Sequence, residues 1–237
     1  MPTQEWNFEK KPVDGWTWTA LAAGLLVLPW AWSSGVLGVG DMVWGTLRGN
    51  RQSWWQFHTA GLIAHWVPFL LIWLALRRNG ESWQSIGLDL AWFRRRWLWF
   101  AGLGVVLVAA AFLMPGVLYE GALPRRSQTH FMAPISVAER LMIILVAVTA
   151  GLTEEVIFRG FAFTRLQRVL RSHWTILTIT LASFLFLHGN PRSVEQLVMY
   201  LIAGAAFGVP FLLMKYRNLH VLVVIHFLID ASMVFAP

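Results

Sequence analysis

Six ionisable residues interrupt long apolar stretches in the second half of this chain. They are Glu154, Glu155, Arg159, His188, His226 and Asp230. Ionisable groups within hydrocarbon are costly, so they usually face a protein interior and serve a function. A free carboxylate beside histidines suits hydrolysis. The carboxylate removes a proton from water and later gives it to the leaving amine, while a histidine donates to the developing oxyanion.

The two adjacent glutamates cannot share one role, because neighbouring helical residues point about 100° apart. Glu155 and Arg159 stand at i, i+4 with the acid first, which is the favourable order for an ion pair. We therefore expect Arg159 to neutralise Glu155. Glu154 is then left to turn toward the two histidines as the general base.

The spacing of the polar residues also predicts their depth. Glu155 and His188 lie at nearly equal distances from a turn near Arg171, so a helical hairpin places them at one level. His226 and Asp230 are i, i+4 and share one face of the last helix. Asp230 is expected to orient a histidine or the water.

The same residue types are also metal ligands. If a metal is bound, Glu154, His188 and His226 are the candidate ligands, with zinc as the ion and a water in the open position. The chain lacks the HExxH pattern that places two histidines on one helix face. We therefore expect no cofactor, and a zinc site stays open as the alternative.

Three short motifs resemble those of one known family. The motifs are Glu154-Glu155-Val-Ile-Phe-Arg159, Phe184-Leu-Phe-Leu-His188 and His226-Phe-Leu-Ile-Asp230. They are similar to the EExxxR, FxxxH and HxxxN or HxxxD motifs of the CPBP family, the CAAX-protease and bacteriocin-processing intramembrane endopeptidases. Each motif is short, but all three occur in order, and the resemblance covers about residues 137–235.

The resemblance implies an all-helical intramembrane peptidase that acts on a membrane-anchored protein or peptide. It makes Glu154 the catalytic glutamate and Glu155 with Arg159 supporting residues. His188, His226 and Asp230 would complete the site. The CAAX-processing members carry Asn where this chain has Asp230. Both a metalloprotease mechanism and a metal-free glutamate–water mechanism are held for the family.

Composition independently indicates a membrane protein. The chain is 57% hydrophobic and 13% charged, with a mean hydropathy of +0.57, whereas soluble domains carry about 25% charged residues. The net charge of +7 is explained by cytoplasmic Lys and Arg anchors, so we expect no nucleic-acid partner. The absence of cysteine excludes disulfides, thiolate metal sites and a Cys nucleophile.

The predicted fold class is all-α, a polytopic transmembrane helix bundle of about seven spans. The expected helices cover about residues 16–39, 57–76, 97–118, 137–171, 174–188, 194–214 and 219–235. The helix over 137–171 is longer than the ~30 Å hydrocarbon core, so its basic second half is expected to protrude or to bend into the interface. Residues 1–136 form N-terminal helices with a basic loop and 137–237 a catalytic bundle, within one integral-membrane domain.

The distribution of Lys and Arg predicts a cytoplasmic N-terminus. We expect a multi-pass protein of a prokaryotic cell (inner) membrane, with the lipid bilayer as a partner and the oligomeric state left open. His58 and His65 share one face of the second helix, and a packing role is favoured over a role in a substrate channel.

Two other functions are the alternatives: a proton- or cation-handling transporter, and a catalytically silent scaffold or immunity protein.

Overall fold

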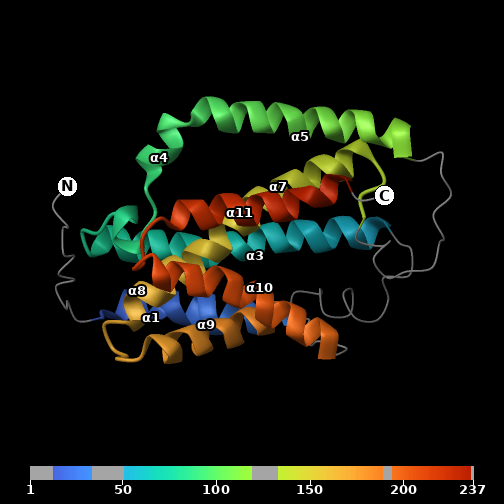
Figure 1. The fold of residues 1–237 in the computed structure, drawn as a ribbon. Coiled ribbons are helices and arrows are strands. Elements are labelled where there is room, and N and C mark those ends of the chain that lie inside the picture. Colours follow the sequence, from blue (N-terminus) through green and yellow to red (C-terminus); the bar gives the residue numbers. More distant parts are fainter. Residues whose placement is uncertain (1–12, 34–50, 119–132, 189–193, 236–237) are drawn as a thin grey trace.

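Every regular element among the described residues is a helix, which confirms the all-α fold class. The computed structural model describes residues 13–33, 51–118, 133–188 and 194–235. In chain order the helical segments are α1 (Gly15–Ala22), η1 (Ala23–Val27), α2 (Leu28–Ser33), α3 (Arg51–Arg78), η3 (Trp83–Ile86), α4 (Leu90–Arg95), α5 (Trp97–Leu118), α7 (Val137–Glu154), η4 (Glu155–Phe161), α8 (Ala162–Leu166), α9 (His173–Leu187), α10 (Val194–Leu213), α11 (Leu219–Ala231) and η5 (Ser232–Phe235) (Figure 1).

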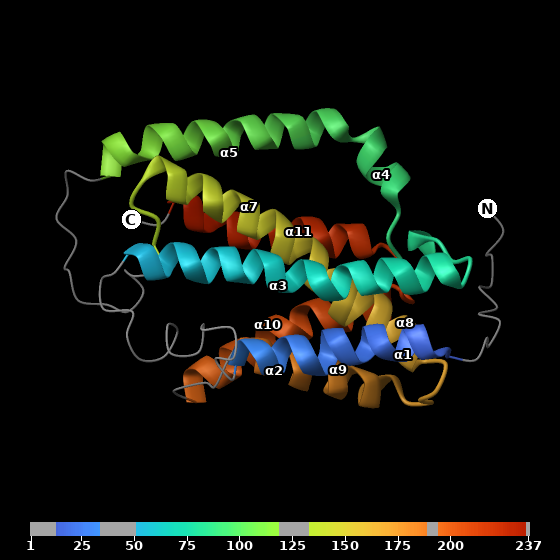
Figure 2. The same cartoon turned by 180° about the vertical axis from the view of Figure 1, so that it is seen from behind.

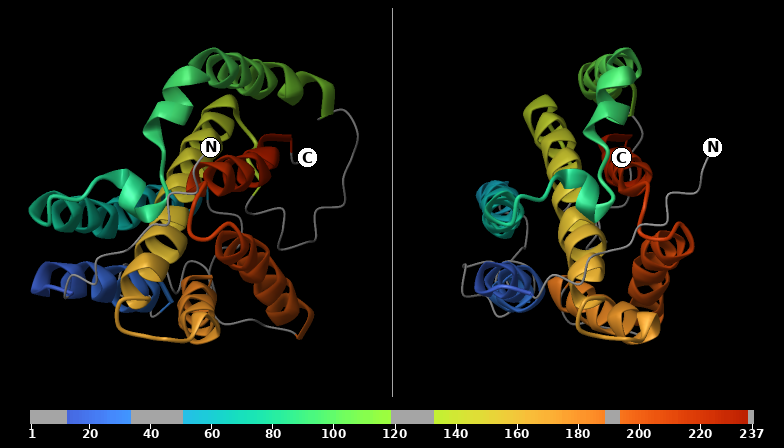
Figure 3. Two further views of the ribbon diagram at one scale, coloured as in Figure 1. Left: turned by 60° about the vertical axis from the view of Figure 1, so that its left-hand side comes forward. Right: turned by 90° about the vertical axis from the view of Figure 1, so that its left-hand side faces the viewer.

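One continuous helix, formed by α7, η4 and α8, lies at the centre of the bundle. α7 packs against α3 and α11, and η4 also contacts α3 and α11. α9 packs against α10 and α2. α5 contacts the bundle mainly along α7 and η5 and stands apart from most of the other helices when seen from behind (Figure 2). The end-on views show the central helix crossing between α3 and α11 (Figure 3). Residues on this helix can therefore meet partners from both neighbours.

The helices overlap the predicted ranges where the structure describes them, although some ends differ by several residues. Trp54–Arg78 and Val137–Leu166 are long and apolar enough to cross a membrane. Four shorter apolar helices are Trp97–Ala109, His173–Leu187, Leu197–Leu213 and Leu219–Phe235. The predicted first helix is described as far as Ser33, and the rest of its range lies outside the described residues. The number of spans and the orientation of the N-terminus stay predictions.

The expected end of the central helix was wrong. It ends at Leu166, before the predicted Arg171, and Arg165 is fully buried within the protein. Its guanidinium pairs with Glu81, and Nη2 of Arg168 lies 2.8 Å from Oε1 of the same carboxylate. Glu81 follows α3, so these ion pairs join the end of the central helix to a distant part of the chain. No Gly or Pro marks this helix end in the sequence.

The central helix begins with a side-chain cap that the sequence encodes locally. Ser136 Oγ accepts a hydrogen bond from the Glu139 backbone N–H at 3.2 Å. The Glu139 carboxylate in turn accepts one from the Ile135 N–H at 2.6 Å. Such reciprocal contacts satisfy N–H groups that the first helical turn leaves without partners. The start of the helix is therefore well defined at Val137.

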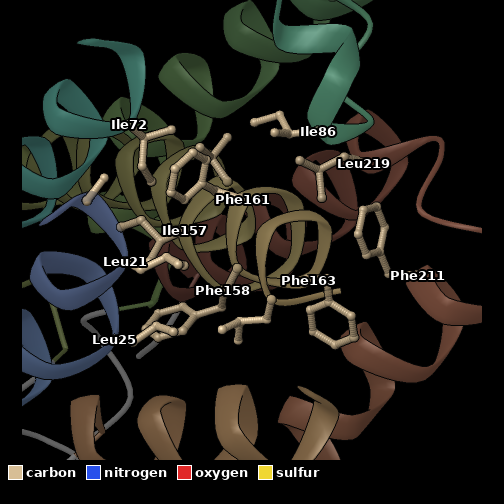
Figure 4. Close-up of a cluster of buried hydrophobic side chains, with 14 of the residues drawn as sticks. Leu21, Leu25, Ile72, Ile86, Ile157, Phe158, Phe161, Phe163, Phe211 and Leu219 are labelled. Atoms are coloured by element: carbon tan, nitrogen blue, oxygen red, sulfur yellow. The ribbon is translucent and has the colours of Figure 1, made fainter. Parts of the chain in front are cut away.

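The π-helical segment η4 carries much of the hydrophobic core. Phe158, Phe161 and Phe163 are fully buried on η4 and α8. They point in different directions, with Phe158 toward Leu25 and Phe163 toward Phe211 (Figure 4). Because these rings pack against several helices at once, they fix the rotation of the helix that carries the paired glutamates.

Candidate active site

Glu154 is a buried carboxylate at the end of α7, and α3 supplies its hydrogen-bond partner. Its Oε1 atom lies 3.1 Å from Nε2 of His65. Its Oε2 atom is buried and has no hydrogen-bond partner among the described residues. A buried carboxylate oxygen is costly to leave without a donor. The arrangement therefore suits a water or a substrate group that donates to Oε2.

Glu155 is fully buried and joins the first and third motifs. Its Oε1 atom accepts a hydrogen bond from Nη1 of Arg159 at 3.1 Å, so the predicted i, i+4 pair is present. The same oxygen accepts one from Nδ1 of His226 at 2.8 Å. Glu155 thus binds two groups that carry or can carry positive charge. It lies in η4, and π-helical turns are frequent at functional sites.

Arg159 is held on several sides. Besides the bond to Glu155, its Nη2 donates to the Gly204 carbonyl at 3.2 Å. Its guanidinium lies 4.8 Å from the ring centroid of Phe184 and 5.4 Å from that of Phe207. These cation–π contacts stabilise a charge removed from water. Arg159 therefore ties α9 and α10 to the carboxylate of Glu155.

His226 is held by carboxylates at both ring nitrogens. Nδ1 faces Glu155, and Nε2 lies 3.4 Å from Oδ2 of Asp230 one helical turn later. Asp230 is the more exposed of these groups, with 33% of its side chain accessible. The expectation that Asp230 orients a histidine is consistent with this geometry. An imidazolium satisfies both carboxylates at once, because only that form donates from both nitrogens.

His188 closes α9 and is partly buried. Its Nδ1 atom donates to the Phe184 carbonyl at 2.9 Å, so Nε2 is the ring nitrogen not used in this contact. The imidazole packs on the rings of Phe184 and Tyr200, with centroids 4.1 Å and 5.3 Å away. The carboxylate of Glu154 interacts electrostatically with His188.

The pairing of histidines with glutamates in the structure differs from the predicted pairing. Glu154 interacts electrostatically with His188 and His226, but its hydrogen-bond partner is His65. The hydrogen bond of His226 goes to Glu155. The sequence interpretation assigned His65 to packing. The signal that pointed to it is a buried ionisable side chain on an apolar helix, which marks a functional candidate.

The six predicted residues do not form a zinc-ligand set in this arrangement. Structural and catalytic zinc sites need at least three protein ligands that converge on one point. No group of three His, Asp or Glu residues in the described part of the chain could hold a metal ion. Both nitrogens of His226 already face carboxylates, and Nδ1 of His188 faces a carbonyl.

Comparison with protein-family models matched residues 136–232 to an Rce1-like family, described as type II CAAX prenyl endopeptidase Rce1-like. The matched segment contains all three motifs, so the resemblance predicted from them is confirmed. It does not contain α3 or His65. Comparisons with curated proteins and with solved structures found no match to the chain.

Proposed function

We propose that this protein is an intramembrane endopeptidase in which Glu154 activates water, because residues 136–232 match the Rce1-like CAAX-protease family. The observation that supports this role is the difference between the adjacent carboxylates at Oε1. Oε1 of Glu155 binds the Arg159 guanidinium and His226, whereas Oε1 of Glu154 contacts the His65 ring. Oε2 of each carboxylate is buried with no hydrogen-bond partner among the described residues. A general base must reach the proton that it removes, and Oε2 is the atom placed to do so.

In the proposed reaction, Oε2 of Glu154 takes a proton from water as the water oxygen attacks the scissile carbonyl carbon. The carbonyl oxygen becomes an oxyanion, which Nε2 of His188 stabilises as a donor when the imidazole is protonated. Glu154 then gives its proton to the leaving nitrogen as the C–N bond breaks. Atoms and charges balance with water as the only co-reactant.

Glu155, Arg159, His226 and Asp230 support the site in this proposal. Glu155 and Asp230 hold His226 from two sides, and Arg159 holds Glu155. The positive charge of a His226 imidazolium adds to the stabilisation of the oxyanion. Asp230 stands where CAAX-processing members carry Asn, and an anionic carboxylate is a poorer oxyanion donor than an amide. We therefore assign Asp230 to orienting His226.

The proposed substrate is a membrane-associated peptide or protein, and the name of the matched family makes a prenylated CAAX peptide the first probe. The test compares the wild type, Glu154→Gln and His188→Ala on a fluorogenic CAAX peptide, with and without a farnesyl group. We expect Glu154→Gln to lower kcat by roughly 100-fold or more. Glu139→Gln is the matched control, because Glu139 is a buried carboxylate near the other end of the same helix.

Two outcomes contradict the proposed function. One is cleavage by Glu154→Gln at the wild-type rate. The other is failure of the folded wild type to cleave either peptide. Insertion of each variant is checked by membrane fractionation, so a loss of activity is not confused with a loss of protein.

A further inference from the structure

His65 lies outside the segment that matches the protease family, yet it contacts the proposed base. It belongs to α3, whereas the match begins at residue 136. Its imidazole is buried, and Nε2 lies 3.1 Å from Oε1 of Glu154. This is a contact between two distant parts of the chain. It places a second ionisable group directly on the carboxylate that carries the proposed chemistry.

The backbone of α3 holds one proton of the His65 ring on Nδ1. Nδ1 lies 2.7 Å from the Gly61 carbonyl oxygen. A carbonyl only accepts, so Nδ1 is the donor in this contact. Nε2 is then directed at Glu154, and when Glu154 is an ionised carboxylate it can only accept, so Nε2 is the donor in this contact and the ring is an imidazolium. The ring is thereby held at both ends, and it holds one oxygen of the carboxylate in turn.

We infer that His65 is a positioning residue that holds Oε1 of Glu154 so that Oε2 is presented to the attacking water. The inference rests on the proposed function. The physical basis is that the Glu154 side chain at the end of α7 can adopt several rotamers. A hydrogen bond to one of its oxygens stabilises one rotamer over the others. A base misplaced by about 1 Å can cost on the order of 100-fold in rate.

His58 shows what distinguishes His65 from an ordinary buried histidine. It lies on the same helix, is also buried, and its Nδ1 donates to the Trp54 carbonyl at 2.8 Å. The two histidines therefore share the same backbone contact four residues back. His58 is two helical turns from His65, about 10 Å along the axis. The contact with Glu154 is the feature that sets His65 apart.

Two conservative variants separate the two hydrogen bonds of His65. The amide nitrogen of Gln reaches about the position of Nε2, so His65→Gln retains a donor toward Glu154. The amide of Asn reaches about the position of Nδ1, so His65→Asn retains only the contact with the Gly61 carbonyl. A positioning role predicts that Gln preserves activity better than Asn. A purely structural role predicts the reverse, or no difference.

The experiment measures kcat and KM for both variants with the farnesylated fluorogenic peptide, beside thermal unfolding in the same detergent. We expect His65→Gln to keep kcat within about tenfold of the wild type. We expect His65→Asn to lose about 100-fold in kcat with KM unchanged within about twofold. The controls His58→Gln and His58→Asn are expected to keep wild-type kcat.

His65→Asn with a kcat equal to or above that of His65→Gln overturns the inference, and so does an equal loss in the His58 controls. If His65→Asn does not accumulate, the result for His65→Gln decides, and a folded His65→Gln that loses more than about tenfold in kcat overturns the inference. If Glu154→Gln is inactive while His65→Asn is fully active, the positioning role of His65 is contradicted and the proposed function is not. An active Glu154→Gln removes the proposed function itself.

Discussion

Nδ1 of His226 lies 2.8 Å from Oε1 of Glu155. The histidine of the third motif is therefore bonded to the second glutamate of the first motif. The same carboxylate oxygen accepts from Arg159. Oε2 of each glutamate is buried with no hydrogen-bond partner among the described residues. The two adjacent glutamates differ at Oε1, which in Glu155 binds Arg159 and His226 and in Glu154 contacts His65.

Substitution of the two glutamates is expected to separate stability from activity. Glu155→Gln leaves Arg159 buried without a carboxylate, and breaking a buried ion pair from one side costs about 3–5 kcal/mol. We expect this variant to unfold at a clearly lower temperature and to lose part of its activity. Glu154→Gln is expected to keep wild-type stability while losing cleavage. Differential scanning fluorimetry beside the peptide assay checks both, and equal unfolding temperatures for the two variants would contradict the assignment.

The close approach of α7 and α11 at Gly151 gives a second prediction. A Cβ atom at Gly151 would lie 2.9 Å from the backbone nitrogen of Phe227. Backbone cannot rotate away as a flexible side chain does, so α11 must shift and carry His226 from Glu155. Overpacking of this kind costs about 1–3 kcal/mol. We expect Gly151→Ala to lower both the free energy of unfolding and kcat.

Gly104 on α5 is the matched control for this substitution, because a Cβ there meets nothing within 4 Å. Gly104→Ala is expected to be neutral or stabilising by up to about 1 kcal/mol, since alanine favours the helix. A Gly151→Ala variant that behaves like Gly104→Ala would show that the two helices tolerate separation.

The ion pairs at Glu81 predict how stability depends on pH. Partial burial acts to raise the pKa of Glu81, but the attraction of Arg165 and Arg168 and hydrogen bonds from Arg168 and Ser85 outweigh it, so its pKa is lowered. A lowered folded-state pKa means that the stabilisation is present above the ordinary carboxylate pKa. It is lost as pH falls through the folded-state value.

Glu81→Gln is therefore expected to destabilise the protein at neutral pH by roughly 1–3 kcal/mol, because Arg165 is left buried without its carboxylate. The difference from the wild type should shrink as the pH is lowered into the acid range. Thermal unfolding from neutral to acid pH measures it. A difference that stays constant over that range would mean that the Glu81 charge does not stabilise the fold.

Metal removal tests the expectation of a metal-free site. His226 faces Glu155 and Asp230 with its two nitrogens, so its lone pairs are not free for an ion. We expect the purified enzyme to keep its activity after incubation with a chelator and dialysis. Elemental analysis supplies an independent measurement. One equivalent of bound zinc, with activity lost on chelation and restored by Zn²⁺, would reverse this expectation.

Local sequence determined the helices and the contacts within them. Apolar runs between turn residues predicted α5 at 97–118 and the last helical stretch at 219–235, and the structure has both. The i, i+4 spacing predicted the pair of Glu155 and Arg159. These features depend on residues within one or two helical turns, so periodicity and residue type are sufficient to find them.

Tertiary structure alone decided which residues from different helices meet. His65 and Glu154 are 89 positions apart, and Glu155 and His226 are 71 apart. Helical periodicity gives the directions of side chains within one helix, but not the rotation and axial offset of one packed helix against another. The π-helical turn at η4 changes those directions further, since its hydrogen bonds run from i to i+5. Packing of the buried phenylalanines fixes the rotation, and with it the choice of His65 as the partner of Glu154.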